Sequence, residues 1–542
     1  MVNAPSRIAA GFATLVLVLS LMSCGSDDEK GATGKNSTLV IAEAATPTSL
    51  DGQFVGNQPQ NLEAALNYAD PLVQLPSRRE ADGTEGVDLS QQPMPYVASS
   101  FTRAPDGLSF RVVLRKGVKS YLGNEMTTED LKYLFDRTSG VEGLCGFVMG
   151  VSSIDKTRPI TVVDKYTADI NLTAPNPVLP LALATIPICT ILDQAEVKKH
   201  VTTADPWAKD WLSTHTAGFG AYHVKSFKPG QETDWVANPN YFKGKLNIQR
   251  VIVKAIPETS SRGALLERAG VDVAVDLTPR QLDKLRHNKK ISVESRTGSA
   301  GLIFGMNNKI PPMDNKDFRQ AVAYALPVGK IVSSVFLGAE GVRPAPGYIP
   351  VGYPGALADW PYGDNPTEAK RLLARSGVTN PKIELSFNSA QAVDQDVAIL
   401  IQTALKAVGI DVVLNNLSPA KYFEQYTKRQ AQTVLVNDTP FTPDGPYVLG
   451  LYFHPDPGVG PANWVNYSNP AVTALINAGL ASGDVQERAR LTEKANKILV
   501  DDAPWGFFLH TGNNLSHLTS VSGYVWQSNN FVRFASFKKS SK

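Results

Sequence analysis

The side chains best suited to chemistry in this 542-residue chain are seven histidines and three cysteines. None of the histidines shows the HExxH, i/i+4 or mixed Cys/His spacing that zinc and related metals need. A Gly-x-Ser-x-Gly nucleophile elbow and a phosphate-binding Gly-x-x-x-x-Gly-Lys-Ser/Thr loop are also missing. We therefore predict no catalytic residue, no metal and no cofactor, and we do not expect an enzyme. The histidines are His200, His215, His223, His287, His454, His510 and His517.

Cys24 directly follows an apolar segment, which favours acylation of its thiol. Arg7 precedes a nearly unbroken apolar run over residues 8–21, which is shorter than a membrane-spanning helix and typical of an export signal. Residues 21–24, Leu-Met-Ser-Cys, are similar to a bacterial lipobox, although methionine is unusual there. Acyl chains contribute about 0.8 kcal/mol per buried methylene, so two or more hold a protein on a membrane. We predict a signal peptide over 1–23, lipidation at Cys24 and a polar tether to residue 37; a plain buried thiol is the alternative.

Cys145 and Cys189 are the thiols that remain after Cys24. Outside the cytoplasm two cysteines are readily oxidised, and closing the loop between them would stabilise the fold by roughly 4 kcal/mol. Two unpaired buried thiols are the alternative. The residues do not decide between the two.

The amino-acid composition limits which classes of protein are possible. A content of 43% apolar and 19% charged residues is ordinary for a soluble globular protein, and the length is too great for one hydrophobic core. Removing residues 1–23 takes away only Arg7, so the formal net charge falls from +2 to +1. The positive and negative charges are balanced and not clustered, so the sequence shows no basic patch that would bind nucleic acid. We expect two or three domains and no nucleic-acid partner.

The elements that must position any site are clearest in the middle of the chain. Residues 302–306 form a short apolar run between glycines and asparagines, which predicts a buried strand ended by Pro311 and Pro312. Asp314 or Asn315 is expected to cap a following helix that closes at Pro327. Further alternating and periodic segments predict a hairpin around 106–114, a helix capped by Thr128, and a strand, helix and strand over 383–414 that favour a parallel sheet.

The particular residues of this stretch are more informative than its secondary-structure pattern. Phe304-x-Met-Asn-Asn-x-x-Pro-Pro-x-Asp-Asn-x-x-Phe-Arg-Gln-Ala-x-x-Tyr-Ala325 resembles a signature of the family 5 extracellular solute-binding proteins. These are oligopeptide- and dipeptide-binding components of ABC importers. Other segments resemble the family's motifs in the same order, namely 47–51, 67–73, 95–119, 123–136, 218–227, 238–242 and 502–508.

The resemblance implies an α/β fold of the two-lobed periplasmic-binding-protein type, class II, with its ligand in the interlobe cleft. An extra subdomain, over residues 70–190, is expected as an insertion in the first lobe. The first lobe itself would comprise residues 38–69, 191–297 and 505–537. The second lobe would comprise residues 298–504, with the chain crossing between lobes at residue 298.

The resemblance also implies where a ligand would be held. In the family an acidic residue after a strand of the second lobe binds the ligand's amine; an ungapped match places Thr442 there, with Asp444 two residues later and Asp438 four earlier. We expect Asp444 to bind the amine and Asp438 to matter less. Arg429 lies where relatives hold a carboxylate. Asn463, Trp464 and Tyr467 match a further family stretch, and the alternative for all of these residues is an exposed loop role.

The expected function follows from the same resemblance. We expect an exported monomer, lipid-anchored on the outer face of the cell membrane, that captures an oligopeptide and delivers it to an ABC permease. One alternative is a receptor for a metal chelate, heme, sugar or other small solute, since relatives bind nickel or heme; His454 and His510 would then be the first residues to consider. A sensor or chaperone working without a transporter, and a hydrolase, are the remaining alternatives.

Overall fold

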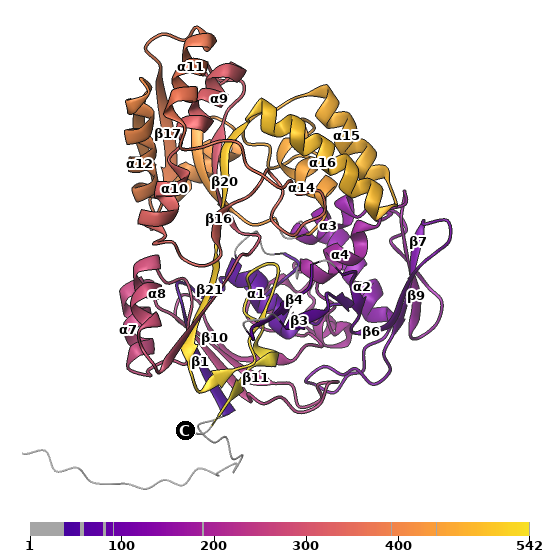
Figure 1. Cartoon of the computed structure of the whole chain (residues 1–542). Helices are drawn as coiled ribbons and strands as arrows, with labels where there is room; N and C mark the ends of the chain where they lie inside the picture. The colour runs from indigo at the N-terminus through magenta and orange to yellow at the C-terminus, as the bar shows by residue number, and fades with distance from the viewer. Residues whose placement is uncertain are drawn as a thin grey trace, which may run out of the picture.

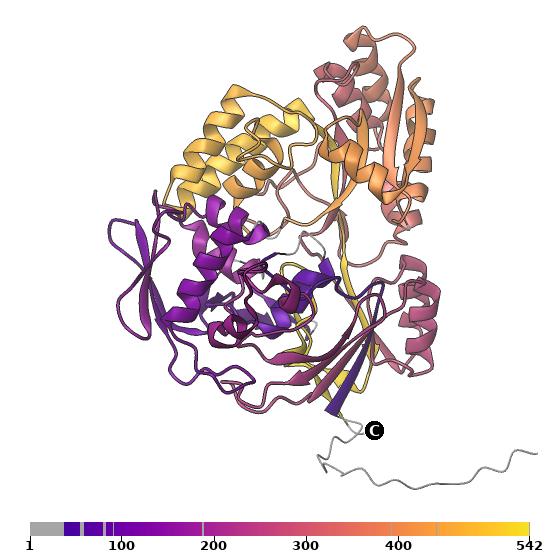
Figure 2. The same cartoon turned by 180° about the vertical axis from the view of Figure 1, so that it is seen from behind.

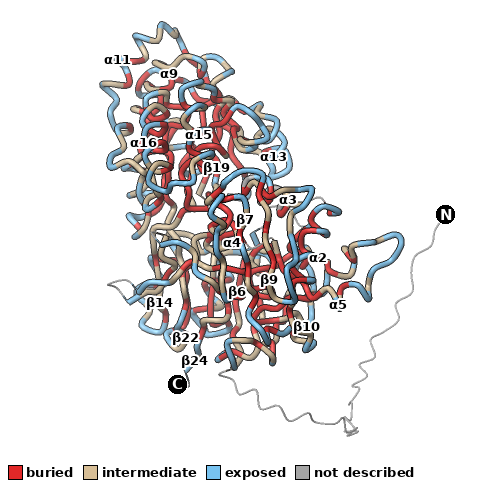
Figure 3. The backbone as a smooth tube through the Cα atoms, turned by 90° about the vertical axis from the view of Figure 1, so that its right-hand side faces the viewer, coloured by how far each residue is buried: buried red, intermediate tan, exposed pale blue. Residues whose placement is uncertain are grey.

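A computed structural model describes residues 37–540, apart from 55–58, 80–82, 90, 142, 187, 188, 392 and 441. The chain forms two lobes, one above the other in Figure 1 and seen from behind in Figure 2. Buried residues are concentrated inside both lobes (Figure 3). Within the described ranges no helix combines the length and apolarity needed to cross a membrane. The predicted signal peptide, Cys24 and most of the tether lie outside these ranges.

The first lobe is built on a seven-stranded sheet with the order β10-β11-β12-β1-β13-β21-β14. Strand β1 is parallel to β12 and β13, and β21 is antiparallel to β13 and β14, so β1, β12, β13 and β14 all run toward the second lobe. The strands are β1 (Thr38–Glu43), β10 (Tyr222–Lys228), β11 (Glu232–Ala237), β12 (Arg250–Ala255), β13 (Val273–Ala274), β14 (Ile291–Arg296) and β21 (Asn513–Leu518).

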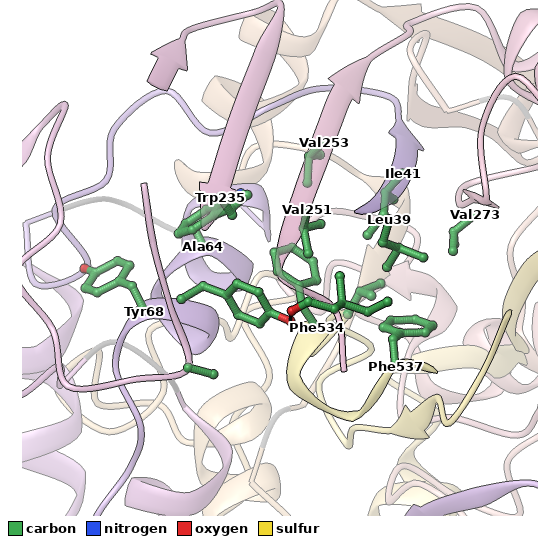
Figure 4. Close-up of a cluster of buried hydrophobic side chains, with 14 of the residues drawn as sticks. Leu39, Ile41, Ala64, Tyr68, Trp235, Val251, Val253, Val273, Phe534 and Phe537 are labelled. Atoms are coloured by element: carbon green, nitrogen blue, oxygen red, sulfur yellow. Dashed lines mark hydrogen bonds between the residues drawn. The ribbon is translucent and has the colours of Figure 1, made fainter. Parts of the chain in front are cut away.

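Helices cover both faces of this sheet. Figure 1 shows α7 and α8 on one flank and α1 on the other. Alternate side chains of β1 and β12 point into a core that Trp235 and Phe534 complete (Figure 4). The helices are α1 (Pro59–Tyr68), α5 (Gln194–Val197), α6 (Lys209–Leu212), α7 (Thr259–Glu267) and α8 (Pro279–Arg286), and short strands β22 (Val521–Ser522) and β24 (Lys538–Lys539) pair near the C-terminus.

The segment expected as an insertion has a sheet and core of its own. This sheet has four strands in the order β6-β7-β9-β8. Thr127, one residue before the predicted Thr128, caps helix α2 because its hydroxyl accepts from the Glu129 amide (3.3 Å). The elements are β2 (Val73–Gln74), β3 (Ser77–Arg79), β4 (Glu85–Val87), β5 (Met94–Pro95), β6 (Ala98–Arg103), β7 (Ser109–Leu114), α2 (Thr128–Gly140), α3 (Leu144–Val151), β8 (Ile160–Val162), β9 (Thr167–Asn171) and α4 (Val178–Thr185); β23 (Val525–Trp526) pairs with β4.

A disulfide joins Cys145 to Cys189, with the two Cα atoms 5.1 Å apart. It ties α3 to the segment that follows α4. Of the two alternatives that the sequence leaves open, the disulfide is therefore the one found.

The second lobe has a six-stranded sheet with the order β16-β20-β15-β19-β17-β18. The predicted strand at 302–306 is confirmed: all six residues of β15 are buried, because hydrophobic clusters cover both faces. The Asn315 carboxamide caps α9 by accepting from the Phe318 amide (3.2 Å). The strands are β15 (Gly301–Met306), β16 (Val342–Pro344), β17 (Lys382–Asn388), β18 (Asp411–Leu417), β19 (Thr433–Asp438) and β20 (Trp505–Thr511).

Helices α9 to α13 accompany the sheet, and α14 to α16 form a layer on the side that faces the inserted segment (Figures 1 and 2). Strand β17 leads through α12 into β18, which is parallel to it as predicted. The helices are α9 (Lys316–Ala325), α10 (Val328–Lys330), α11 (Pro366–Ser376), α12 (Asp394–Ala407), α13 (Pro419–Thr427), α14 (Gly445–Phe453), α15 (Pro470–Ala481) and α16 (Val485–Asp502).

The chain crosses between the two sheets twice. The first crossing runs from β14 to β15, as expected from residue 298, and the second runs from β20 to β21 at Gly512 (φ 75°). Residues 505–511 are expected from the sequence in the first lobe, and this is wrong. Strand β20 is antiparallel to both β15 and β16, so the return to the first lobe comes only after it.

A pair of carboxyl groups is buried beside the end of β1 that faces the second lobe. Glu43 and Glu63 are hydrogen-bonded to each other, and the Val532 amide donates to Glu63 Oε2 (2.8 Å). Burial raises the pKa of Glu63 to about 7, and burial together with the neighbouring Glu63 and Asp276 raises that of Glu43. The guanidinium of Arg262 opposes this rise only in part. The environment of the two carboxyl groups therefore favours a state in which the pair keeps a proton.

We expect stability to fall as the pH rises from about 4.5 to about 7. The folded-state pKa of Glu63 lies above its ordinary value, so this stabilisation is complete below pH 4.5 and is lost as the carboxyl ionises near pH 7. Thermal unfolding of the parent and of Glu63→Gln across this pH range measures how stability changes with pH. The variant should show a smaller slope, the remainder coming partly from Asp394, whose pKa burial also raises to about 7. Equal slopes would contradict the assignment.

Candidate functional site

The carboxyl end of β19 lies at the edge of the second sheet that faces the first lobe. Gly301, directly after the first crossing, is paired with Asp438, whereas Met306 is paired with Thr433. A strand rises roughly 3.3 Å per residue, so the two ends of β15 lie roughly 17 Å apart. The position of a residue along these strands therefore decides whether it can reach a ligand between the lobes.

Asp438 is a half-buried carboxylate at this edge. Its Oδ1 accepts from the Thr439 amide (2.7 Å) and its Oδ2 accepts from the Tyr452 hydroxyl (3.0 Å). Burial raises its pKa, and among the described residues no lysine, arginine or histidine forms an ion pair with it. A carboxylate held in place by two neutral donors is suited to bind an ammonium group, because a cation would offset its desolvation.

Asp444, the residue expected to bind the amine, forms an ion pair with Arg488. Its Oδ1 accepts from Arg488 Nη2 (2.6 Å) and its Oδ2 accepts from Arg488 Nε (2.8 Å). The same carboxylate caps α14 by accepting from the Tyr447 amide (3.0 Å). Both partners of this ion pair are buried, with side chains 3% and 9% exposed. The structure thus does not support the expected role of Asp444, and of the two predicted carboxylates Asp438 is the one without an ion pair to a described residue.

Thr442 lies at the contact between the two lobes. It is fully buried, and its hydroxyl is 3.3 Å from the hydroxyl of Thr185 at the end of α4. Asn529, from the C-terminal part of the chain, donates to the Thr185 carbonyl (3.0 Å) and so extends this contact into the first lobe. The structure therefore holds the lobes together at Thr442, four residues beyond Asp438.

Arg429 lies at the opposite end of the second sheet. Its carbonyl accepts from the side chain of Asn307, just past the far end of β15, and its guanidinium donates to the Gly460 carbonyl (3.2 Å). It cannot reach a ligand beside Asp438 across roughly 17 Å of strand. The register of β15 and β19 carries Arg429 away from the lobe contact, so the structure does not support the expectation that it binds a ligand carboxylate.

Asn463, Trp464 and Tyr467 share that far end and are core residues. Asn463 is hydrogen-bonded to backbone groups of His454 and Tyr467 (3.2 and 2.8 Å). Trp464 packs against Tyr426, with ring centres 4.7 Å apart, and the Tyr467 hydroxyl donates to Asp502 (2.6 Å). All three are at most 5% exposed. Their expected contact with ligand is not supported, and neither is the alternative of an exposed loop.

The described residues of both lobes line two cavities between them. The hinge cavity, of about 340 Å³, is bounded by both crossings, by the β3–β4 segment and by residues 351–352 of the second lobe. The far cavity, of about 320 Å³, lies where α3 and residues 153–176 meet α14 and α15. Each is at the lower end of the size of small-molecule sites.

The sequence pattern alone misses two hydroxyl-bearing residues, Tyr353 beside the segment after Asp438 and Ser299 in the wall of the hinge cavity. The Tyr353 hydroxyl donates to the carbonyl of Pro440, two residues after Asp438 (2.7 Å). The Ser299 hydroxyl, at the first crossing, donates to the Ser528 carbonyl (2.7 Å). Ser299 could have been suspected, because it directly precedes the strand at which the chain changes lobes; Tyr353 lies in a loop with no periodic signal.

The histidines that could have served a metal are held within the protein. His454 Nδ1 accepts from the Asp456 amide (3.2 Å), and its Nε2 lies 3.1 Å from Asn477 Oδ1. His510 Nε2 accepts from the Val351 amide (3.2 Å), and burial lowers its pKa to about 4. Within the described ranges no three His, Cys, Asp or Glu side chains are grouped as a metal site.

Two sheets joined by two crossings, with ligand-sized cavities between them, define a bilobal solute-binding protein. The model of the bacterial extracellular solute-binding proteins, family 5, matches residues 92–459, and the chain belongs to that family. The α/β two-lobed fold and the family predicted from the sequence are confirmed. The chain is accordingly an exported solute-binding protein.

Individual relatives agree with this assignment. The probable D,D-dipeptide-binding periplasmic protein DdpA of Escherichia coli (strain K12) is 28% identical over 496 residues, 90% of this chain and 91% of that protein. Heme-binding protein A of Haemophilus influenzae is 24% identical over 548 residues, 95% of both. The structure of DppA from Helicobacter pylori in complex with peptide STSA superposes with a TM-score of 0.78 at 21% identity, covering 93% of this chain and 98% of that one.

Proposed function

We propose that this protein is the substrate-binding component of an ABC importer and that it captures a short peptide between its lobes for delivery to the permease. The observation that carries the proposal is Asp438, a carboxylate near the lobe contact with hydroxyl and amide donors and, among the described residues, no cationic partner. A peptide's ammonium group would supply the missing charge. The relatives named for a D,D-dipeptide and for peptide STSA support this ligand class.

Capture requires that the ligand bind the closed arrangement more tightly than the open one, since equal affinity would shift no population. Thr442 and Thr185 meet across the lobes in the structure, and we take this contact as part of the closed arrangement. A peptide placed at Asp438 would extend toward the hinge cavity past Ser299 and Tyr353. Its extended backbone offers hydrogen-bonding groups that do not depend on its sequence, which would allow a broad set of peptides. No step of this process requires catalysis.

Asp438→Asn should weaken binding of a free-amine peptide by ten-fold or more. A hydrogen bond to a charged group typically contributes about 1.5–3 kcal/mol, and 1.4 kcal/mol corresponds to ten-fold in affinity. A peptide library, screened by thermal shift and followed by calorimetry, supplies the ligand. The same peptide N-acetylated should bind the parent weakly and be little affected by the variant.

Asp411→Asn, at an exposed carboxylate on β18 of the same lobe, is the matched control and should bind like the parent. A parent that binds free and acetylated peptides equally would refute the amine assignment. Mass spectrometry of ligand co-purified with the protein tests the peptide class separately: amine-bearing peptide masses support it, and a porphyrin or metal chelate would replace it.

We further propose that Cys24 carries the lipid anchor. The support is the apolar run over residues 8–21 followed by Leu-Met-Ser-Cys. Cys24→Ser should abolish palmitate labelling and release the protein from the membrane fraction, since the acyl chains supply the membrane affinity. Ser26→Ala, two residues beyond, should keep both properties. A Cys24→Ser protein that is processed and still sediments with membranes would show that the anchor lies elsewhere.

A further inference from the structure

A third cavity, of about 380 Å³, lies in the first lobe. Its walls come from β2, from residues 241–247 after β11 and from residues 525–536 near the C-terminus. Among the described residues that line it, none belongs to residues 298–504. The cavity shares Val87, Gln527 and Ser528 with the hinge cavity, so it adjoins the space between the lobes on the first-lobe side, and we call it the first-lobe cavity.

The first-lobe cavity has an excess of positive charge. Lys243, Lys245 and Arg533 line it, and the described lining residues include no aspartate or glutamate. Behind the wall, Asp70 forms an ion pair with Arg533 and so neutralises one of the three cations. Among the described residues no carboxylate forms an ion pair with Lys243, which is held instead 4.1 Å from the centre of the Tyr96 ring.

The floor of the cavity supplies fixed hydrogen-bonding groups. Arg533 Nη2 donates to the Tyr96 hydroxyl (3.1 Å), and that hydroxyl lies 2.9 Å from the hydroxyl of Tyr241. Both tyrosines are buried, and the Arg533 side chain is 13% exposed. The amides of Gln74, Asn247 and Gln527 add further donors around the wall.

The electrostatics of Lys243 agree with an unfilled requirement for negative charge. Burial and the positive charge of Arg533 lower the pKa of Lys243, and the carboxylate of Asp70 offsets this only in part. An anion between Lys243 and Arg533 would reverse the effect, because it would attract both cations. Hydrogen bonds between ionised groups are about twice as strong as neutral ones.

We propose that the first-lobe cavity is a binding site for a small oxyanion, a phosphate or a multiply charged carboxylate, held between Lys243, Lys245 and Arg533. This site is additional to the one at Asp438 and lies on the first-lobe side of the hinge cavity, since the two cavities share Val87, Gln527 and Ser528. The described residues of the second lobe contribute none of its wall.

Calorimetry on the exported protein at low ionic strength tests the site, with inorganic phosphate and citrate as separate probes. We expect one-to-one binding of at least one probe. The double variant Lys243→Gln/Lys245→Gln should weaken that binding by ten-fold or more. Lys245 is exposed and Lys243 is only partly desolvated, so the variant should fold like the parent, which circular dichroism checks. Lys225→Gln/Lys228→Gln, at two exposed lysines of β10, is the control of equal charge and should bind like the parent.

The outcomes separate cleanly. Binding of phosphate alone or of citrate alone supports the site and identifies the oxyanion; loss of either only in the Lys243/Lys245 variant locates it. The proposal is overturned if neither probe gives saturable binding, or if both double variants weaken binding equally, which would indicate general attraction to net charge. The result does not depend on Asp438, so it can fail while the peptide proposal stands, and the reverse.

Discussion

Arg488→Met should lower the free energy of unfolding of the second lobe by about 3–5 kcal/mol, because it leaves the Asp444 carboxylate buried without a counter-charge. The bidentate pair between them is nearly inaccessible to water. Arg488 Nη1 also donates to the carbonyls of Gly479 and Ser482 at the end of α15 (2.5 and 3.0 Å). One side chain therefore joins the start of α14 to the end of α15, and urea unfolding measures its loss.

Helix α16 offers a matched control two residues further on. Arg490 pairs with Glu487 at 2.5 Å, but the two side chains are 53% and 38% exposed. Exposed pairs typically contribute about 0–1 kcal/mol, so Arg490→Met should change stability little. Equal losses from Arg488→Met and Arg490→Met would show that burial of the first pair does not set its energetic role. Asp444→Asn should behave like Arg488→Met and should leave peptide binding by the folded protein intact.

Replacing both cysteines of the Cys145–Cys189 bond by alanine should cost the inserted segment about 4 kcal/mol. The bond closes a loop with a sequence separation of 44 residues, and the chain-entropy relation converts that length into this value at 25 °C. Cys145 is buried in the core of the segment, so part of its packing is lost as well. Denaturant unfolding followed by hydrogen exchange, which resolves the segment from the second lobe, measures the change.

Reduction of the parent is the control for this variant. Dithiothreitol should lower the stability of the parent toward that of the double alanine variant and should leave the variant unchanged. Protection in β15, which lies in the other lobe, should be the same in both proteins. A parent whose inserted segment is equally stable with and without reductant would contradict a stabilising role for the bond.

Much of the fold follows from local chemistry that the sequence displays. The apolar run at 302–306 is a buried strand, Asn315 is a helix cap, and the strand, helix and strand over 383–414 form a parallel pair. These succeed because each depends on residues close together in the chain. The placement of 505–511 fails because it depends on which sheet accepts the strand, and that pairing joins residues about two hundred positions apart.

The candidate site was harder to predict, for a physical reason that Asp444 illustrates. Its partner Arg488 is 44 residues away, and nothing near Asp444 announces the pair. One local signal was present: Asp444-Gly445-Pro446 places an acidic cap before a proline at the first turn of α14, a pattern typical of a helix start. This pattern predicts that Asp444 caps a helix, which would have made Asp438 the better candidate for the amine.

Strands β20 and β21 have a consequence for the order in which the nascent chain folds. Strand β20 lies between β16 and β15, and β21 lies between β13 and β14, so each sheet receives an interior strand from the last part of the sequence. The second-lobe network is complete only after residue 511 has been synthesised, and the first-lobe network only after residue 518. Contacts between residues so distant in sequence form slowly. Both lobes of the growing polypeptide should therefore stay incompletely folded until β20 and β21 have left the ribosome, and an incompletely folded chain is the state that a translocation channel accepts.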